Sequence, residues 1–583
     1  MNSKTIEADQ LKSRTATFRQ FQMNGMLTAF KLKKYLPTMI LTNLSTLLLV
    51  TVDGLVVGNL LGPDALSSVN IFYPATIFIG VLSVLVSSGV STCLSLHMGQ
   101  NDMAKLPGIK ATAKWAMLLF ALIVGLVQIP IVSAMIASYH LSPSMLAMTR
   151  QYAVGIMISA PFGLISTVGV YELQIVGKMK RIMTLSVVEG ITNLALDLLF
   201  TGVFRMGVAG AGFGTACASI LRCALTVICL SRESDIYHSG GARPSAAHGK
   251  EILSLGLADA AYMLMQAFQN YFIVMLILRF LGEGGGAIKG VCVFTLSLAF
   301  VFINGVQGAM RPLAGLLSGA KEWYGLRLLM RQCFALVVSL VGLFSAAVIL
   351  FPQMFYYANG VRAIPADGLI AVRLFALHFV FKGCDTLFRS YFVNRSESRY
   401  STVLTVAGYA AMPLLAFLIG LSGGGRWLWI AYLLAELIIF TCNLLHYLSR
   451  VRRDTKEDVE DQGLIHLSVR PDEAVEASRL VRRYADAHGI DRIKSNRTSV
   501  CLEEMAAYSQ ESQKIDSLQI QIMIRFRPHT AMLMMIDNGR CIALDEDKET
   551  QELMISNYDL IRKVARDVKY QYIQDMNYTV IEI

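Results

Sequence analysis

Long apolar runs separated by short polar stretches dominate the first 448 residues of the chain. Each run is long enough to cross a bilayer as an α-helix, which takes about 20 apolar residues. We predict twelve membrane spans, at residues 35–61, 65–97, 112–137, 151–176, 182–204, 207–230, 252–281, 287–315, 328–351, 367–393, 400–420 and 427–448. The pattern therefore predicts an all-α polytopic membrane protein over this part of the chain.

Basic residues between these runs set the predicted orientation. Loops assigned to the inner side carry several Lys and Arg each, as at Lys178, Lys180 and Arg181, whereas loops assigned to the outer side carry one apiece, such as Arg205. Basic residues collect in the cytoplasmic loops of membrane proteins. We therefore expect a multi-pass protein of the plasma membrane, surrounded by the lipid bilayer, with cytoplasmic N- and C-termini.

The composition supports this class and excludes others. Hydrophobic residues make up 54% of the 583 residues and charged residues only 16%, which excludes a soluble globular protein. The net charge of +10 belongs mostly to the short loops, so it describes topology and predicts no nucleic-acid partner. The 10 Cys are scattered without a CxxC pair, so we expect small buried side chains, no disulfides and no tightly bound metal.

An internal repeat divides the membrane part into two halves. Gly62 after the first span recurs as Gly282 after the seventh, and Gly99 after the second recurs as Gly319 after the eighth, both at an offset of 220 residues. Two six-helix lobes in the same orientation would produce this pattern, and such lobes are common in secondary transporters. Chance matches between glycines, which are frequent in membrane helices, are the alternative. The predicted domains are a cytoplasmic tail (1–30), an N-lobe (31–230), an inter-lobe loop (231–250), a C-lobe (251–448), a charged linker (449–463) and a soluble domain (464–583).

The soluble α/β domain is predicted from a change of pattern after Tyr447. A charged stretch is followed by short runs rich in apolar and alternating residues, which are typical of strands. A helix is expected at 472–489, where Gly489 ends it. Strands are expected at 464–470, 518–526, 531–537 and 579–583.

Acidic and polar residues inside the apolar runs are the candidate functional groups. Asp53 lies in the first span, where a carboxylate costs several kcal/mol unless it is neutralised, paired or hydrated. Asp197 and Thr215 lie at the same predicted depth, about 12–14 Å below the outer surface, and Asn193 is one helical turn from Asp197. Two carboxylates with amide and hydroxyl oxygens suit a monovalent cation or a proton, so we expect these four residues to form one cation- or proton-binding site. Taken alone, Asn193 and Thr215 could instead be helix-packing residues.

Other charged residues in the spans have more ordinary interpretations. Glu189 is a candidate secondary site residue, with structural pairing as the equal alternative. Asp385 is a second candidate, although its i,i+3 spacing from Lys382 predicts a structural salt bridge. Asp259 is expected to be interfacial, and Glu436 has no evident partner in the sequence.

Several segments of the membrane part resemble the multidrug and toxic compound extrusion (MATE) transporters. These segments are VDGLVVGNLLGPDALSSVNIFYP, GVSTCLSLHMGQND, TNLALDLLF, GVAGAGFGTACA, ILSLGLADAA and GVQGAMRPLAGLLSGAKE. The resemblance covers about residues 30–448 and implies a two-lobed secondary antiporter that exports organic cations, drugs or toxic metabolites in exchange for Na⁺ or H⁺. In the DNA-damage-inducible-type branch of this family, the N-lobe cation site uses an Asp in helix 1, an Asn and an Asp in helix 5, and a Thr in helix 6. Those motif positions fall on Asp53, Asn193, Asp197 and Thr215.

One departure from the family concerns the C-lobe. Branches that rely on this lobe place an essential acid midway along helix 7, where the present chain offers only Gln266, Gln269 and Asn270. The departure argues against a cation site in the C-lobe, although Asp385 could contribute to one.

The soluble domain resembles the GHKL-type ATP-binding domain of anti-sigma-factor serine kinases. The similar segments are TSVCLEEMAAYSQ, AMLMMIDNGRCIAL and LIRKVARDVKYQYIQDMNYTVIEI. That fold uses an acid followed four residues later by an Asn to hold Mg²⁺, an Asp-x-Gly to bind adenine, and a Gly-rich lid over the phosphates. Glu504, Asp537 and Gly539 match, whereas Tyr508 occupies the Asn position and Ser556-Asn557-Tyr558 replaces the glycine turn. We expect a degenerate regulatory module that hydrolyses no ATP and has a candidate cytoplasmic protein partner; an inert stabilising appendage is the alternative.

Three functions are compatible with these features. The first is a cation-coupled exporter of small, cationic amphiphilic molecules, which is not an enzyme and needs only Na⁺ or H⁺ as the coupling ion. The second is a flippase for a lipid-linked precursor, which would need a cationic cavity for pyrophosphate. The third is a membrane-anchored ATP-binding signalling protein whose helices sense a ligand.

Overall fold

The computed structural model of the protein describes residues 26–583, apart from short stretches within that range. The stretches outside the description are 62, 101–104, 139–141, 233–241, 282–283, 360, 363, 366, 461–463, 514–517, 528–529, 541–556 and 574–575. The chain forms two compact units. One unit, Lys34–Lys321 with Leu329–Leu448, contains the membrane helices; the other joins Ser449–Ile583 with Met1–Lys33 and Glu322–Leu328.

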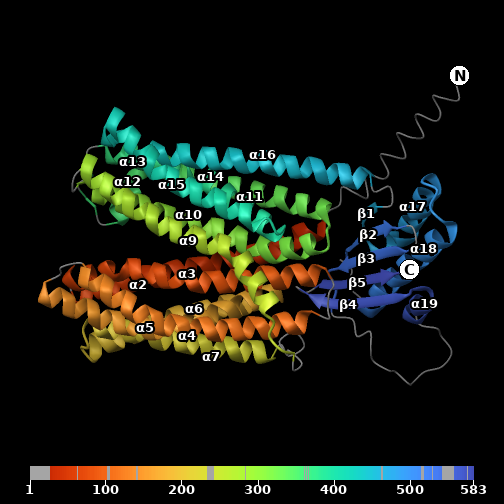
Figure 1. The fold of residues 1–583 in the computed structure, drawn as a ribbon, viewed down its shortest axis with the longest axis horizontal. Helices are drawn as coiled ribbons and strands as arrows, with labels where there is room; N and C mark the ends of the chain where they lie inside the picture. Colours follow the sequence, from red (N-terminus) through yellow and green to blue (C-terminus); the bar gives the residue numbers. More distant parts are fainter. Residues whose placement is uncertain are drawn as a thin grey trace. The chain divides into compact units, whose positions relative to one another are not determined.

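The helices of the membrane unit fall into two groups that correspond to the predicted lobes (Figure 1). The N-lobe contains α2 (Met26–Leu61), α3 (Pro63–Gly99), α4 (Leu106–Ser138), α5 (Pro143–Ile175), α6 (Met179–Asp197), the π-helix η1 (Leu198–Val203) and α7 (Val208–Arg232). The C-lobe contains α9 (Ala246–Leu281), α10 (Gly284–Gly319), α11 (Trp323–Leu350), α12 (Pro352–Ala358), α13 (Gly368–Ala376), α14 (Phe379–Asn394), α15 (Ser398–Gly423), the short 3₁₀ helix η2 (Gly425–Trp427) and α16 (Ile430–Glu460).

Ten helices among the described residues are long and apolar enough to cross a membrane. The first predicted span corresponds to α2, whose side chains are described only in part. The tenth predicted span, 367–393, is wrong as a continuous helix, because it is interrupted between α13 and α14 at Leu377 and His378. The Ser345 hydroxyl donates a hydrogen bond of 2.6 Å to the Ala376 carbonyl, and the His378 ring contacts the Phe375 carbonyl. Side chains that occupy main-chain carbonyls in this way interrupt the regular helical ladder.

The charged stretch that follows the last membrane span was predicted as a linker at 449–463. In the structure α16 continues through this stretch to Glu460, so the segment that follows the last membrane span is helical, and 461–463 lie outside the described residues. The apolar pattern ends at Leu448, but Arg, Lys and Glu are good helix formers, which lets the helix continue beyond the apolar part.

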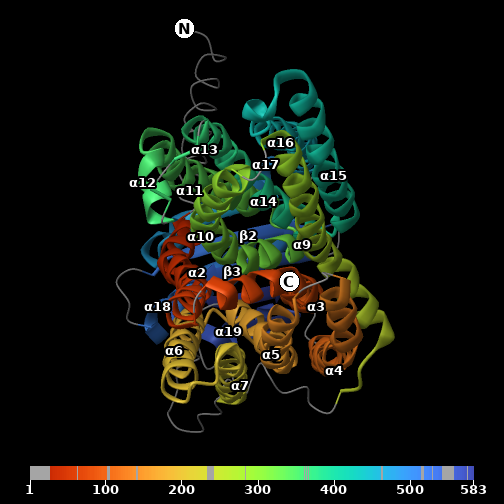
Figure 2. The same ribbon diagram turned by 90° about the vertical axis from the view of Figure 1, so that its left-hand side faces the viewer.

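Helix α3 of the N-lobe lies beside α9 and α10 of the C-lobe (Figure 2). Four glycines allow these helices to touch at the predicted cytoplasmic end. A Cβ on Gly99 would lie 2.1 Å from the Leu316 carbonyl oxygen, and a Cβ on Gly319 would lie 2.1 Å from the Leu96 carbonyl oxygen. These contacts between α3 and α10 are reciprocal, as expected of two halves related by the repeat.

The other two glycines of this set bring α3 against α9. A Cβ on Gly89 would lie 2.1 Å from the Ile252 carbonyl oxygen, and one on Gly256 would lie 1.9 Å from the Leu85 carbonyl oxygen. Main-chain atoms of the two lobes therefore pack directly against each other here. We call Gly89, Gly99, Gly256 and Gly319 the four-glycine contact.

The soluble unit is built on a five-stranded antiparallel sheet with the order β1-β2-β3-β5-β4. Its elements are β1 (Leu464–Val469), η3 (Pro471–Glu473), α17 (Ala474–Ala487), α18 (Arg492–Gln513), β2 (Ile520–Phe526), β3 (Ala531–Asp537), α19 (Asn557–Val564), β4 (Asp567–Ile573) and β5 (Met576–Glu582). Four strands and α17 lie where the sequence predicts them, and Gly489 after α17 has a positive φ of 66°. Helices α18 and α19 and strand β4 were not predicted.

Alternation along the strands creates the core of this unit. Ile520, Ile522 and Ile524 all point to one face, since residues two apart in a strand share a face. They pack in one buried cluster with Val481 of α17 and Leu502 of α18. The helices thus cover one face of the sheet and bury its apolar side chains.

Candidate functional site

The N-lobe brings three of the four predicted cation-site residues together between α6 and α7. Asn193 and Asp197 are one turn apart on α6 and therefore share a face of that helix. The Asn193 amide Nδ2 donates a hydrogen bond of 3.2 Å to Thr215 Oγ1 on α7, and this hydroxyl donates to the Ala211 carbonyl at 3.1 Å. Asn193 and Asp197 are buried, with 4% and 0% exposure.

A glycine of α7 makes room for the Asp197 carboxylate. A Cβ on Gly214 would lie only 2.2 Å from Asp197 Oδ1, so any larger residue would collide with the acid. The π-helix η1 starts at the next residue, Leu198, and Phe204 N–H bonds the Leu199 carbonyl at 2.9 Å across the wider turn. Such π segments within membrane or soluble helices are frequent at functional sites.

Asp53 lies on α2, as predicted, but its side chain is outside the described ones. Its place beside Asp197 therefore stays a prediction. Glu189, the secondary candidate, forms an ion pair of 2.7 Å with Arg222 of α7. This pairing corresponds to the structural alternative for Glu189, because the guanidinium occupies the carboxylate.

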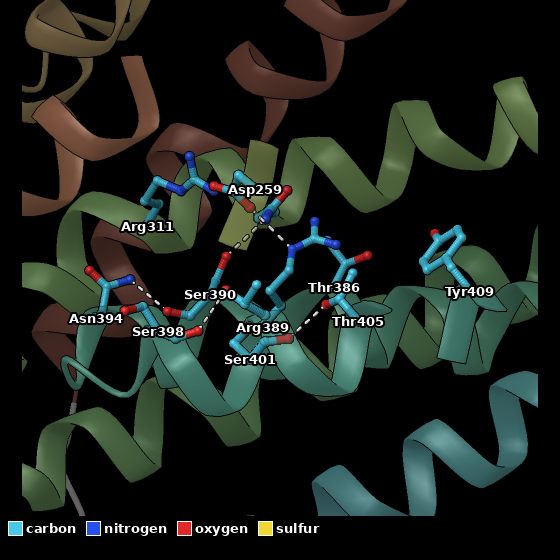
Figure 3. A network of polar contacts seen from close by, with 12 residues as sticks. Asp259, Arg311, Thr386, Arg389, Ser390, Asn394, Ser398, Ser401, Thr405 and Tyr409 are labelled. Atoms are coloured by element: carbon cyan, nitrogen blue, oxygen red, sulfur yellow. Dashed lines mark hydrogen bonds and ion pairs between the residues drawn. The ribbon is translucent and has the colours of Figure 1, made fainter. Parts of the chain in front are cut away.

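The C-lobe contains a second set of buried charges, shown in Figure 3. Asp259 on α9 lies between two guanidinium groups: Arg311 of α10 at 2.6 Å and Arg389 of α14 at 3.1 Å. The Arg389 guanidinium also stacks 3.6 Å from the centroid of the Tyr262 ring. Asp259 is only 7% exposed, and its pairing with two guanidinium groups was not predicted from the sequence. Its two ion pairs join α9 to α10 and to α14 inside the C-lobe.

The expected salt bridge between Lys382 and Asp385 is replaced by longer-range contacts. Lys382 Nζ on α14 donates to Glu436 Oε1 of α16 at 2.6 Å and also to the Tyr409 hydroxyl. Asp385 accepts a hydrogen bond of 2.7 Å from Asn443 Nδ2. The i,i+3 spacing predicted the wrong partner because Lys382 pairs with a carboxylate on another helix. Glu436, for which the sequence indicated no partner, is therefore paired with Lys382.

Lys382, Tyr409 and Glu436 also line a partly open cavity of about 40 Å³. It is lined by Gln266, Gln269, Asn270, Val293, Leu296, Phe300, Phe375, His378, Lys382, Tyr409, Tyr432 and Glu436. Amides, an imidazole and one ion pair on an aromatic wall can bind a small organic molecule in a fixed orientation. The ion pair leaves the cavity close to neutral.

The amide side chains of helix 7 were identified from the sequence, but the cavity that they line was not predicted. Lys382 and Glu436 belong to spans that are far apart in sequence, and their pairing depends on how α14 and α16 pack. One feature of the sequence did indicate this pairing. A Lys and a Glu within two apolar spans are costly in free energy to bury unless the two side chains form an ion pair. The helix break next to His378 also lies on the cavity wall, where interrupted membrane helices commonly form binding sites.

In the soluble unit, Asp537 is the centre of a hydrogen-bonded cluster. Its carboxylate accepts from the Gly539 amide at 2.9 Å, the Asn577 amide at 2.6 Å and the Ser509 hydroxyl at 3.2 Å. Burial raises the pKa of Asp537, and these hydrogen bonds only partly offset that effect. The acid expected to bind adenine thus already has protein partners.

The other residues in the resemblance to a nucleotide-binding site match that site only in part. Glu504 is half-buried on α18, and Tyr508 on the same helix packs against the apolar core of the unit. Asn557 begins α19, whereas Ser556 and the whole stretch 541–556 lie outside the described residues. The structure therefore places a Tyr side chain in the core where the resemblance expects a metal ligand.

Comparison with protein families and curated proteins gives consistent matches over the membrane part. Residues 38–199 match the family model MatE. A Multidrug export protein MepA from Staphylococcus aureus (strain bovine RF122 / ET3-1) is 22% identical over 414 residues, which cover 69% of this chain and 90% of that protein. A Probable multidrug resistance protein YpnP from Bacillus subtilis (strain 168) is 29% identical over 180 residues, or 28% of this chain and 37% of that protein.

Solved structures show the same fold. A structure described as an outward-facing conformation of a multidrug resistance MATE family transporter of the MOP superfamily has a TM-score of 0.69 at 20% identity, covering 73% of this chain and 96% of that one. A MOP superfamily transporter from Pyrococcus furiosus, described as having a binding pocket of reverse polarity, has a TM-score of 0.68 at 20% identity, covering the same shares. The membrane part therefore has the fold of MATE transporters. Residues 38–199 also match the model of this family, whose members are transporters and not enzymes.

Proposed function

We propose that this protein is a secondary active antiporter that exports small, mostly cationic organic molecules from the cytoplasm in exchange for Na⁺ or H⁺. The observation that carries the proposal is the cluster of the buried Asn193 and Asp197 with the half-buried Thr215, at the start of the π-helix. Its chemistry suits a coupling cation, since a carboxylate, an amide oxygen and a hydroxyl can replace the water around a small cation or hold a proton. Asp53 on α2 completes the site in this proposal.

The proposed coupling depends on the charge of the buried acid. Burying an ionised carboxylate such as Asp197, which is 0% exposed, is unfavourable, so a cation or proton that enters from outside stabilises the arrangement in which the site is closed around it. The substrate favours the other arrangement of the lobes. Exchange follows because each ligand shifts the same equilibrium in opposite directions.

The nature of the substrate is suggested by the relatives and by the C-lobe cavity. Two relatives carry names of multidrug export or resistance proteins. The cavity has aromatic side chains in its wall and is close to neutral, because Glu436 balances Lys382. A flippase for a lipid-linked pyrophosphate would need uncompensated positive charge, which the pairing of Lys382 does not supply. We therefore favour export of organic molecules over lipid flipping.

Transport by the purified full-length protein in proteoliposomes tests this proposal. A fluorescent organic cation is loaded on one side, and Na⁺ and H⁺ gradients are imposed separately. Asp197→Asn and Asp53→Asn should each abolish gradient-driven movement, whereas Ser166→Ala, a buried hydroxyl of α5, serves as the matched control and should retain it. Movement that persists in both Asp variants would contradict cation coupling through this site.

For the soluble unit we propose a regulatory role without ATP hydrolysis. Support comes from Asp537, whose oxygens already accept three hydrogen bonds, and from Tyr508, which packs in the core. Measuring Mg-ATP binding and hydrolysis by the full-length protein tests the proposal. Tight, Mg²⁺-dependent binding would favour the rival ATP-binding signalling function.

A further inference from the structure

Three metal-ligating side chains meet where α3 and α9 cross. Cys93 and His97 are one turn apart on α3, and Glu251 comes from α9. The Cys93 Sγ, a His97 ring nitrogen and a Glu251 oxygen all lie within 4.8 Å of one another. The sequence predicts no metal here, because Glu251 is distant in the chain and only the packing of the two lobes brings it to the pair on α3.

The spacing of His97 and Glu251 matches two ligands of a tetrahedral metal centre. His97 Nε2 lies 3.2 Å from Glu251 Oε1. Two ligands bound to Zn²⁺ at about 2.0–2.1 Å with tetrahedral angles are roughly 3.3 Å apart. A zinc ion could therefore enter between them with little movement of either side chain. The longer Zn–S bond of about 2.3 Å fits a thiolate at the third corner, and a water would take the fourth.

The surroundings favour a metal ligand role for His97 over a simple hydrogen bond. His97 is 8% exposed, and its Nδ1 is buried without a hydrogen-bond partner among the described residues. An unsatisfied buried nitrogen costs about 1–3 kcal/mol, which coordination or a reoriented ring would recover. Cys93 is fully buried, while the Glu251 side chain is 40% exposed and opens the cluster to solvent. A metal ion can thus reach the site past Glu251.

We propose that Cys93, His97 and Glu251 form a Zn²⁺-binding site that ties α3 of the N-lobe to α9 of the C-lobe. Zinc is the divalent ion that this mixture of thiolate, imidazole and carboxylate suits in the cell. A harder cation such as Mg²⁺ or Ca²⁺ would avoid the sulfur. The mixture also differs from the all-oxygen cluster in the N-lobe, so the two sites select different ions.

The position of the site gives it a regulatory consequence, which rests on the proposed transport function. Gly89 lies one turn before Cys93, and Ile252 directly follows Glu251, so the main-chain contact between these helices fixes the ligand positions. Because the ligands come from both lobes, the site is complete only while α3 and α9 stay in contact. Bound zinc stabilises that arrangement by mass action and so inhibits a cycle that must separate them.

Metal binding to the purified full-length protein is the first test. The protein is stripped with a chelator, titrated with Zn²⁺ against a chromophoric competitor, and separately loaded with Co²⁺ as a spectroscopic probe. We expect one Zn²⁺ per chain and a thiolate-to-cobalt charge-transfer band. Cys93→Ser should remove the band, and His97→Gln and Glu251→Gln should weaken Zn²⁺ binding at least roughly tenfold.

Controls separate this site from other thiols and from misfolding. Cys223→Ser removes a buried thiol of α7 and should leave both signals unchanged. Zinc-free thermal unfolding of each variant shows whether it is folded, and a folded Glu251→Gln variant with wild-type zinc affinity would overturn the site. A cobalt spectrum without a thiolate band in the wild-type protein would overturn it as well.

The second test measures the consequence for transport. Each protein is compared with and without Zn²⁺ in proteoliposomes, relative to its own zinc-free rate. We expect Zn²⁺ to slow the wild type and to have at least tenfold less effect on Cys93→Ser. Unaltered transport by wild-type protein that shows full zinc occupancy would overturn the inhibitory consequence. The cobalt band is read without any substrate, so a failure of the proposed transport function remains distinguishable from a failure of the metal site.

Discussion

Lys382 Nζ and Glu436 Oε1 lie 2.6 Å apart inside the C-lobe, and their side chains are only 5% and 10% exposed. The pair joins α14 to α16 and forms part of the wall of the C-lobe cavity. Charges buried this deeply are tolerated because each removes the cost of the other. Loss of one partner therefore affects the molecule more than loss of both.

This relationship predicts an asymmetry among variants. Lys382→Met leaves Glu436 buried and unpaired and should lower the free energy of unfolding by about 3–5 kcal/mol. The double variant Lys382→Met with Glu436→Leu should recover most of that loss. Unfolding in detergent, followed by tryptophan fluorescence, provides the measurement. A single variant as stable as the double variant would contradict the pairing.

Gly214 provides a test of the N-lobe site that leaves its polar residues in place. Gly214→Ala adds a methyl group that would lie 2.2 Å from Asp197 Oδ1, so the carboxylate must move away from its position between α6 and α7. We expect transport to fall at least about tenfold while the protein remains folded, since a shift of about 1 Å in a binding site can cost that much or more.

The matched control for this variant is Gly163→Ala in α5, where a Cβ would meet nothing within 4 Å. It makes the same chemical change in a helix of the same lobe and should keep the wild-type rate. Equal transport by both variants would mean that the exact position of the Asp197 carboxylate is unimportant.

The reciprocal contact of Gly99 and Gly319 predicts matched effects from two distant substitutions. In Gly99→Ala and in Gly319→Ala the new methyl group would lie 2.1 Å from a carbonyl oxygen of the facing helix. Both should separate α3 from α10 and should raise the accessibility of nearby thiols, such as Cys93, to a labelling reagent. Gly125→Ala in α4, where a Cβ meets nothing within 4 Å, is the control. A marked effect of only one of the two would argue against the internal symmetry.

Asp537 predicts a pH dependence of the soluble unit. Because burial raises the pKa of this carboxyl in the folded unit, the folded state holds the proton more tightly than the unfolded state does. Its contribution to stability is therefore fully present below the unfolded pKa and is lost as the pH rises through the folded pKa. Asp537→Asn removes this loss and keeps an acceptor for Gly539 and Asn577.

The Asn variant should therefore gain stability relative to the wild type as the pH rises above about 4, the ordinary pKa of an Asp carboxyl. Hydrogen exchange of the β3 amides in the full-length protein measures this difference. The exposed Asp472→Asn serves as the reference for the general effects of removing a charge and for the intrinsic pH dependence of exchange. A constant difference between Asp537→Asn and the wild type across this rise in pH would contradict the prediction.

Local patterns predicted most of the fold, and long-range packing accounts for the misses. The apolar runs located the membrane helices, and alternation located β1, β2 and β3, because both signals are carried by neighbouring residues. The break before His378 was missed because it depends on a hydroxyl of another helix, Ser345. Its effect on α13 and α14 cannot be derived from the apolar pattern of the span itself.

The candidate sites follow the same rule. Asn193 and Thr215 were placed together correctly from depth alone, since both lie on neighbouring helices that cross the bilayer side by side. The partners of Lys382 and Asp259 were not predicted, because they come from other helices and the sequence does not show which helices are neighbours. Depth can be computed from a sequence, whereas the angle at which one helix faces another cannot.

The four-glycine contact has a consequence for the entropy of lobe closure. A contact surface made of side chains loses rotamer freedom each time it forms, at up to about 2 kcal/mol for a long side chain, whereas glycine has no side chain to immobilise. Lobes that meet through Gly89, Gly99, Gly256 and Gly319 can close with little entropic penalty and reopen without rearranging a core. Such a surface removes the loss of side-chain entropy from the cost of bringing the two lobes together.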